Sequence, residues 1–137
     1  MRKLFVITAL LLFAGITFSQ PLQKGNLLGI HVITVTLEPD VTMDQFLKFY
    51  SEKYIPELEK TFEDWKLFVM KGIRGEHKNS IGLLFQIKDE ATRNLYNNDD
   101  GTSTELAKKM FEELEPVYNE LKELGTWTFS YTDWILQ

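Results

Sequence analysis

The sequence of 137 residues contains no cysteine. This absence excludes disulfides, thiol nucleophiles, cysteine-based zinc sites and iron–sulfur clusters, although it is compatible with an oxidising compartment. Histidine is nearly as scarce, because His31 and His77 are the only two in the chain. Neither stands in an H-x-x-x-H or carboxylate-paired metal-ligand spacing. The sequence therefore predicts no metal site and no cofactor.

Basic residues are also fewer than acidic ones. The chain has 15 lysines and arginines against 20 acidic residues, for a net charge of −5, and no basic cluster. Nucleic-acid binding needs a patch that neutralises phosphates, so no nucleic-acid partner is expected. The motifs G-x-S-x-G, G-x-x-x-x-G-K-[ST] and G-x-G-x-x-G are absent as well. Their absence removes the familiar signatures of serine hydrolases, P-loop proteins and dinucleotide-binding proteins.

One long apolar run is present, at the N-terminus. Arg2 and Lys3 precede an apolar segment from Leu4 to Phe13, and small residues follow at positions 17 and 19. This pattern is typical of a secretory signal peptide, here residues 1–19, and the run is short for a membrane span. We expect the remaining residues 20–137 to form one exported domain, periplasmic or secreted, without membrane attachment. An uncleaved membrane anchor is the alternative.

Alternating apolar and β-branched residues predict strands over residues 27–37, 65–70, 81–87 and 126–135. A first helix is expected from Thr42, with Gln45 completing a capping box and Pro56 interrupting the helix. A short helical piece is expected after Asp89. A second long helix is expected from a Thr102–Glu105 capping box to Gly125 as C-cap, bent at Pro116. Together these elements follow the order β-α-β-β-α-β.

That order is the ferredoxin-like pattern of the α+β class, with helices on one face of a four-stranded antiparallel sheet. Right-handed crossovers predict the spatial strand order 4-1-3-2. The segments 27–37 and 65–70 carry apolar residues at both parities, for example Ile30 and Val32 against Ile33 and Val35. The face without helices therefore also needs cover. We expect a homodimer.

Three segments carry a resemblance to a known family. They are the alternating strand at 27–37, the stretch LEPDVTMDQFLKFY at 37–50 that leads into the first helix, and the aromatic strand at 126–135. Over roughly residues 27–136 the chain resembles the dimeric α/β-barrel superfamily, which includes antibiotic-biosynthesis-type monooxygenases and stress-responsive barrel proteins. The resemblance implies two sheets facing each other across a dimer, with small ligands between sheet and helices. It assigns no catalytic residue, because the Asn, Trp and His set of the haem-degrading members has no match here, and fold alone does not give function.

The stretch KGIRGEHKNSIG at 71–82 joins the second and third predicted strands. Gly72, Gly75 and Asn79 are typical of a turn, so the charged residues between them are expected to be a solvated hairpin tip. The alternative is that Arg74 folds back to bind a ligand carboxylate.

A second candidate site lies where the first and last strands pair. There His31 and Asp133 are expected on one face at adjacent strand ends, where the carboxylate would orient the imidazole as a general base. A structural histidine with a carboxylate partner is the alternative. Aromatic residues provide candidate walls for a planar apolar ligand, with core filling as the alternative: Tyr54, Trp65, Tyr96, Trp127, Tyr131 and, on the neighbouring position of the last strand, Trp134.

These observations predict an exported homodimer that binds a small, partly apolar molecule between sheet and helices. A cofactor-independent enzyme of monooxygenase or isomerase type, using His31, Asp133 and a tyrosine, is the second hypothesis. A structural or interaction protein with a filled core is the third. A cavity beside His31 would favour the first two hypotheses, and a packed interior the third.

Overall fold

The computed structural model describes residues 21–137. The predicted signal peptide lies outside the described residues. Within residues 21–137, no helix has the length and apolar character that a membrane crossing requires.

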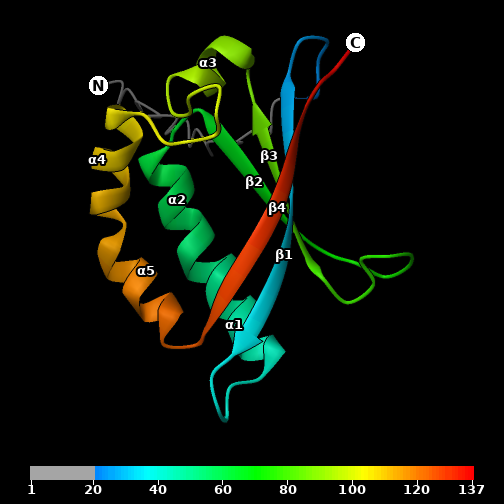
Figure 1. Ribbon diagram of the computed structural model, residues 1–137, viewed down its shortest axis with the longest axis vertical. Helices are drawn as coiled ribbons and strands as arrows, with labels where there is room; N and C mark the ends of the chain where they lie inside the picture. The colour runs from blue at the N-terminus through cyan, green and yellow to red at the C-terminus, as the bar shows by residue number, and fades with distance from the viewer. Residues whose placement is uncertain (1–20) are drawn as a thin grey trace, which may run out of the picture.

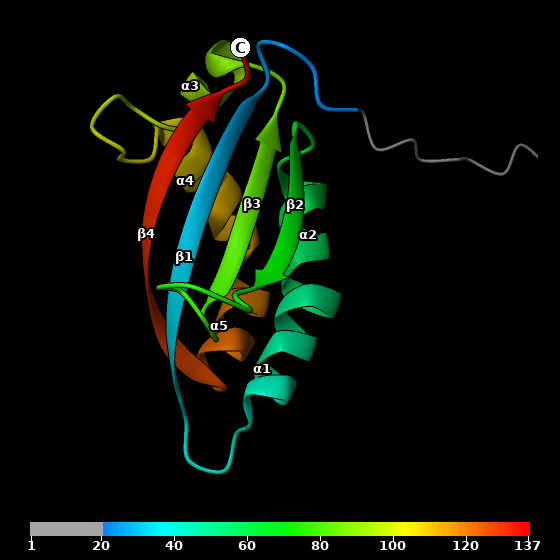
Figure 2. The ribbon, with the colours of Figure 1, turned by 90° about the vertical axis from the view of Figure 1, so that its right-hand side faces the viewer.

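The described chain folds as one antiparallel sheet with helices on one side (Figures 1 and 2). The strand order β2-β3-β1-β4 confirms the order expected from the sequence, and every neighbouring pair is antiparallel. The fold is therefore ferredoxin-like and of the α+β class. In chain order the elements are β1 (Leu27–Leu37), α1 (Met43–Phe49), a π-helical turn (Tyr50–Tyr54), α2 (Ile55–Thr61), β2 (Trp65–Lys71), β3 (Ile81–Ile87), α3 (Glu90–Asn94), α4 (Glu105–Glu113), α5 (Glu115–Lys122) and β4 (Gly125–Ile135).

The first helical segment begins as predicted. The Thr42 hydroxyl accepts a hydrogen bond from the Gln45 backbone N–H, and the Gln45 side chain accepts one from the Thr42 N–H at 2.7 Å. The predicted interruption takes the form of a π-helical turn that ends two residues before Pro56, which has no N–H for a regular helical bond. This turn places Tyr50 and Tyr54 side by side, with ring centroids 5.4 Å apart.

The predicted capping box at the start of α4 is wrong. Thr104 is the N-cap, and its hydroxyl accepts from the Ala107 N–H at 3.2 Å. Thr102 instead donates its hydroxyl and its backbone N–H to Asp100, at 2.6 and 2.9 Å. The aspartate therefore holds Thr102 in the preceding turn, two residues before the helix begins.

The predicted end of the second long helix also needs correction. The helix is broken at Leu114, with Pro116 in the first turn of α5, and α5 ends at Lys122. Gly125 is the first residue of β4 and not a C-cap. A Cβ at this position would lie 2.6 Å from the Thr36 carbonyl oxygen, so glycine allows the close approach of β4 to β1.

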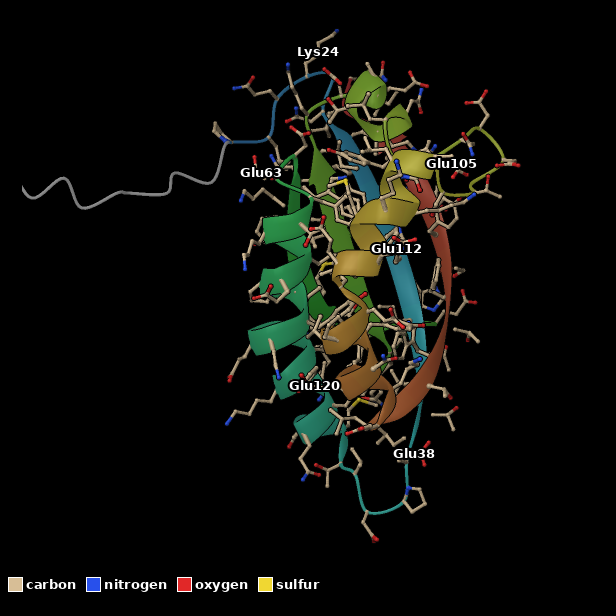
Figure 3. All side chains as sticks on the ribbon, turned by 90° about the vertical axis from the view of Figure 1, so that its left-hand side faces the viewer. Lys24, Glu38, Glu63, Glu105, Glu112 and Glu120 are labelled. Atoms are coloured by element: carbon tan, nitrogen blue, oxygen red, sulfur yellow. The ribbon has the colours of Figure 1, made fainter. Side chains whose placement is uncertain are left out.

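The core lies between the sheet and the helices (Figure 3 views the molecule from the helical side). Ile33, Leu67 and Leu83 face it from the strands, and Phe46, Phe62 and Leu121 are its largest fully buried side chains, contributed mainly by the helices. The opposite side of the sheet, the open face, has no helical cover (Figure 2). Its exposed apolar residues are Ile30 (38%), Phe68 (42%), Met70 (39%) and Trp134 (59%).

The β2–β3 hairpin projects on the side of the open face, away from the helices (Figure 1). Gly75 and Asn79 adopt positive φ angles of 80° and 72°. A Cβ on Gly72 would lie 1.8 Å from the His77 carbonyl oxygen, so the turn requires glycine there. Arg74, His77 and their charged neighbours are exposed. The segment is a polar hairpin tip, as its sequence indicates.

Candidate ligand-binding site

A cavity of about 260 Å³ lies between the helix-facing side of the sheet and the helices. Strand residues form one wall, a helical wall comes from the segment around the π-helical turn, and the loop between α3 and α4 contributes polar residues. Gly29 leaves space at the end of β1 because a Cβ there would lie 3.1 Å from Asp133 Oδ1 and 3.4 Å from Phe85 Cβ. The cavity therefore reaches the backbone of the sheet beside the Asp133 carboxylate.

His31 lies on the strand wall, opposite Tyr131 of β4 and Leu83 of β3. Its imidazole packs among three aromatic rings, with centroid distances of 4.5 Å to Phe85, 5.2 Å to Phe129 and 5.3 Å to Tyr131. Burial lowers the pKa of His31, and the nearby Asp133 carboxylate opposes that shift more weakly. His31 is therefore a neutral imidazole at neutral pH, with one nitrogen that donates and one that accepts.

Asp133 shares the cavity with His31, but the expected hydrogen bond between them is not formed among the described residues. The Asp133 carboxylate instead accepts a hydrogen bond from Arg93 Nε, with a distance of 2.9 Å to Oδ2. The side chains of the pair are 12% and 27% exposed. In the β1–β4 register Asp133 stands opposite Gly29, two positions from the pair His31–Tyr131 and on the same side of the sheet, and Arg93 of α3 brings its guanidinium to the carboxylate. The prediction that Asp133 orients His31 is therefore corrected.

Arg93 also fixes the loop that follows it. One terminal nitrogen, Nη1, donates to the backbone carbonyls of Asn97 and Asn98, at 3.2 and 3.0 Å. The same loop brings Gly101 against β4, where an added Cβ would meet the Tyr131 hydroxyl at 2.3 Å. Arg93 thus ties the α3–α4 loop to the polar end of the cavity.

The helical wall carries two tyrosines. Burial, together with the neighbouring Tyr118, raises the pKa of Tyr54 to about 12, and burial raises the pKa of Tyr50 further. Both groups are therefore protonated hydroxyls near neutral pH, able to donate and to accept hydrogen bonds.

Trp65, the first residue of β2, is another part of the cavity lining and is only 5% exposed. Its ring stacks on Phe62 with centroids 4.0 Å apart, and Phe85 and Tyr96 meet it edge-on. Among the described residues, Trp65 Nε1 is a buried side-chain polar atom without a hydrogen-bond partner. An unpaired buried donor is unusual in a folded protein, because its desolvation is not compensated.

The remaining predicted site residues divide into two groups. Trp127 and Tyr131 line the cavity, together with Tyr54, Trp65, His31 and Asp133. Tyr96 does not line it, since it is buried in the core and its hydroxyl donates to Asp64 at 2.9 Å. Arg74 is exposed on the projecting hairpin, on the other side of the sheet from the helices. Trp134 follows Asp133 in β4 and therefore lies on the opposite side of the sheet, the open face. The predictions for Tyr96, Arg74 and Trp134 are corrected accordingly.

Two cavity residues of importance were not predicted. Phe85 packs on both His31 and Trp65, and Arg93 holds Asp133 and the α3–α4 loop. The alternating pattern of residues 81–87 places Phe85 on the helix-facing side, which is a usable signal. Nothing in the local sequence connects Arg93 to Asp133, 40 residues further along the chain. Within residues 21–137, no three histidine, aspartate or glutamate side chains are grouped so that they could hold a metal ion.

Comparisons with known proteins give matches to solved structures only. No family model matches it, and no curated protein matches its sequence. Among solved structures it is similar to a dimeric protein of unknown function and ferredoxin-like fold from Bacteroides fragilis, with 14% identity, a TM-score of 0.47, and coverage of 82% of this chain and 98% of that one. It is also similar to a de novo designed protein, with 9% identity, a TM-score of 0.36, and coverage of 78% and 94%. The resemblance to monooxygenases stays a prediction.

Proposed function

We propose that this protein binds a small, partly apolar molecule in the cavity between the sheet and the helices. The observation that carries the proposal is the cavity itself, about 260 Å³ and lined by aromatic residues from the strands and the helical segment. A cavity of roughly 150 Å³ is enough to hold benzene in other proteins. The space here suits a molecule of one or two rings, and Arg93, Asp133 and His31 supply polar groups at one side.

The two other hypotheses have less support. A structural protein with a filled core does not explain the cavity. The enzyme hypothesis required a carboxylate to orient His31, and Asp133 is bonded to Arg93 instead. His31 is a neutral imidazole among aromatic rings. As such it can hydrogen-bond a ligand without the carboxylate partner that the enzyme hypothesis requires.

The proposal is tested by filling the cavity. His31→Trp adds volume on the helix-facing side, and Ile30→Trp, one residue earlier, adds the same ring to the open face. Naphthalene binding is followed by NMR shifts of the purified protein. We expect His31→Trp to abolish the shifts and Ile30→Trp to preserve them. Equal binding by both variants would place the naphthalene elsewhere and contradict the proposal. Melting curves confirm that both variants fold.

We also propose that two copies associate through their open faces. Ile30 of β1 and Phe68 of β2 are partly exposed there on either side of Leu84 in the intervening strand β3, and Met70 of β2 is exposed beside them. Monomeric soluble proteins rarely leave a large continuous apolar patch uncovered. The projecting hairpin adds Ile73, which is 73% exposed and lies on the same side. A second copy would present the same surface in a two-fold arrangement. Sedimentation equilibrium of the purified protein tests this, and a monomer at tens of micromolar would contradict it.

We propose, finally, that residues 1–19 direct export and are then removed. The support is the sequence pattern of a basic start, an apolar run and small residues at positions 17 and 19. The intact mass of the protein recovered after expression in a secreting host should correspond to a chain that begins at Gln20. Recovery of the full-length chain in the membrane fraction would indicate an uncleaved anchor instead.

A further inference from the structure

We infer that the ligand is an uncharged planar molecule of one or two rings that accepts a hydrogen bond from Trp65 Nε1. This inference rests on the proposed function, since it concerns the same cavity.

The first step is the unpaired donor. Trp65 is 5% exposed and lines the cavity, and its Nε1–H has no partner among the described residues. An indole nitrogen can only donate a hydrogen bond, so its partner must be an acceptor. Nε1 itself is closed to water, so a ligand in the cavity reaches it through a small shift of the Trp65 ring or its neighbours. A ligand that carries an acceptor would then relieve the desolvation of this N–H, and a ligand without one would leave the N–H unpaired in the complex. The site should therefore discriminate between such ligands.

The second step is shape. The walls around the cavity are aromatic rings on both sides of the space: Phe85, Phe129 and Tyr131 pack on His31 from the strands, and Tyr50 and Tyr54 lie on the helical wall. Flat rings pack most closely against other flat rings, by offset stacking or edge-on contact. The volume of about 260 Å³ exceeds the roughly 150 Å³ that accepts benzene and leaves space for a second ring.

The third step is charge. Arg93 and Asp133 are the charged residues of the lining, and they neutralise each other in a hydrogen-bonded ion pair of 2.9 Å. Nη1 of Arg93 is also engaged, by the carbonyls of Asn97 and Asn98. A charged ligand would lose hydration without gaining a counter-charge, which is costly in an apolar site. An uncharged ligand avoids that cost.

Naphthalene, quinoline and isoquinoline provide the test. The three share one two-ring outline, and the last two carry a ring nitrogen that accepts in the ring plane, at two different positions. All three are titrated into ¹⁵N-labelled protein at pH 7.5, and the indole N–H signals of the three tryptophans are followed. We expect at least one of the nitrogen compounds to bind about tenfold more tightly than naphthalene, the worth of one hydrogen bond at the upper end of its usual range. Its binding should move the Trp65 indole proton downfield.

Trp65→Phe keeps an aromatic ring and removes the donor, while Trp134→Phe makes the same change on the open face, where Trp134 is 59% exposed. Trp65→Phe should reduce the preference for the nitrogen compound to about onefold, and Trp134→Phe should leave it unchanged. Equal affinities for all three compounds in the wild type, or a downfield shift absent at Trp65, would overturn the inference while leaving the cavity as a binding site. Failure of naphthalene and of both nitrogen compounds to bind would overturn the proposed function and the inference with it. The wild-type titration decides the matter even if Trp65→Phe does not fold.

Discussion

The two faces of the sheet are built from the same four strands but have different surroundings. On the helix-facing side, Ile33, Leu67 and Leu83 are at most 7% exposed, because α1, α2, α4 and α5 cover them. On the open face, Ile30, Phe68 and Met70 are 38–42% exposed, because nothing in the described chain covers them. Since successive strand residues point to opposite sides, one strand encodes two surfaces independently. The helices cover the first surface except along β4, where Phe129 and Tyr131 beside the cavity are 57% and 44% exposed, whereas no helix within residues 21–137 covers the second surface (Figure 2).

The largest expected effect is the difference in lost stability between a substitution in the core and one on the open face. Phe62 is fully buried and stacks on Trp65, whereas Phe68 is 42% exposed on the open face. Phe62→Ala should lower the free energy of unfolding by about 3–5 kcal/mol, the usual cost of emptying such a core position. Phe68→Ala should lower it by less than about 1 kcal/mol when the protein is dilute enough to be monomeric. Urea denaturation at low protein concentration measures both, and similar losses would remove the distinction between the faces.

The next effect concerns self-association. Phe68→Lys places a charge in the apolar open face, and disrupting a central interface side chain costs about 2 kcal/mol or more, or roughly 30-fold in the dimer dissociation constant. Phe129→Lys is the matched control, because Phe129 is 57% exposed but lies on the helix-facing side, beside His31. Sedimentation should show dissociation for the first variant alone. Dissociation caused by Phe129→Lys alone would move the interface to the other side of the sheet.

A third variant tests the polar end of the cavity. Arg93→Gln removes the ion pair with Asp133 and leaves a carboxylate that is 27% exposed without its charged partner. We expect a loss of about 1.5–3 kcal/mol in the free energy of unfolding, since hydrogen bonds to charged groups lie in that range. Lys53→Gln removes the ion pair with Glu120, whose side chains are about half exposed, and should cost no more than about 0.5 kcal/mol. Chemical denaturation of the two variants gives the comparison, and equal losses would mean that Arg93 acts as a surface residue.

The strands were predictable because their signal is local. Alternation marks residues 27–37 and 81–87 with the bounds that β1 and β3 have, and the connection rules then determine the strand order. Capping was predictable at Thr42, where one hydroxyl is available, but not at the start of α4. There Thr102 and Thr104 both stand near the helix start, and Asp100 decides between them through a hydrogen bond.

For the site, the sequence predicts only which strand residues share a face, because that follows from the backbone register. The pairing of β1 with β4 placed His31 and Asp133 on one side of the sheet, two positions apart in the register. Which cation approaches the carboxylate depends on where α3 lies, and that follows from tertiary packing. The cavity also depends on Gly29 and on the aromatic rings around it, which together determine how completely the helices fill the space. Pattern alone does not distinguish an aromatic residue that fills a core from one that borders a cavity.

The smallest effect is a pH dependence that belongs to the helix-facing side alone. Burial holds the pKa of His31 in the folded protein below its ordinary value of 6.5. As the pH falls below about 6.5, the unfolded chain therefore takes up a proton more readily than the folded one does. Stability should be full above that pH and should decrease from there down to the lowered folded-state pKa. The measurement is the urea midpoint at pH 7.5, 6.5 and 5.5. This window lies above the range of Asp89 and Asp100, whose pKa values are lowered by hydrogen bonds from Thr92 and Thr102.

The chain offers its own control for this measurement, because its second histidine lies on the opposite side of the sheet. His31→Gln should flatten the dependence between pH 7.5 and 5.5, since the glutamine does not titrate. His77→Gln should leave it intact, because His77 is exposed on the projecting hairpin. If the stability of His31→Gln still decreased from pH 7.5 to 5.5, another group would be taking up the proton. That result would contradict a lowered pKa for His31. If the slope disappeared with His31 alone, the same neutral imidazole would be available to an uncharged ligand at the pH where binding is measured.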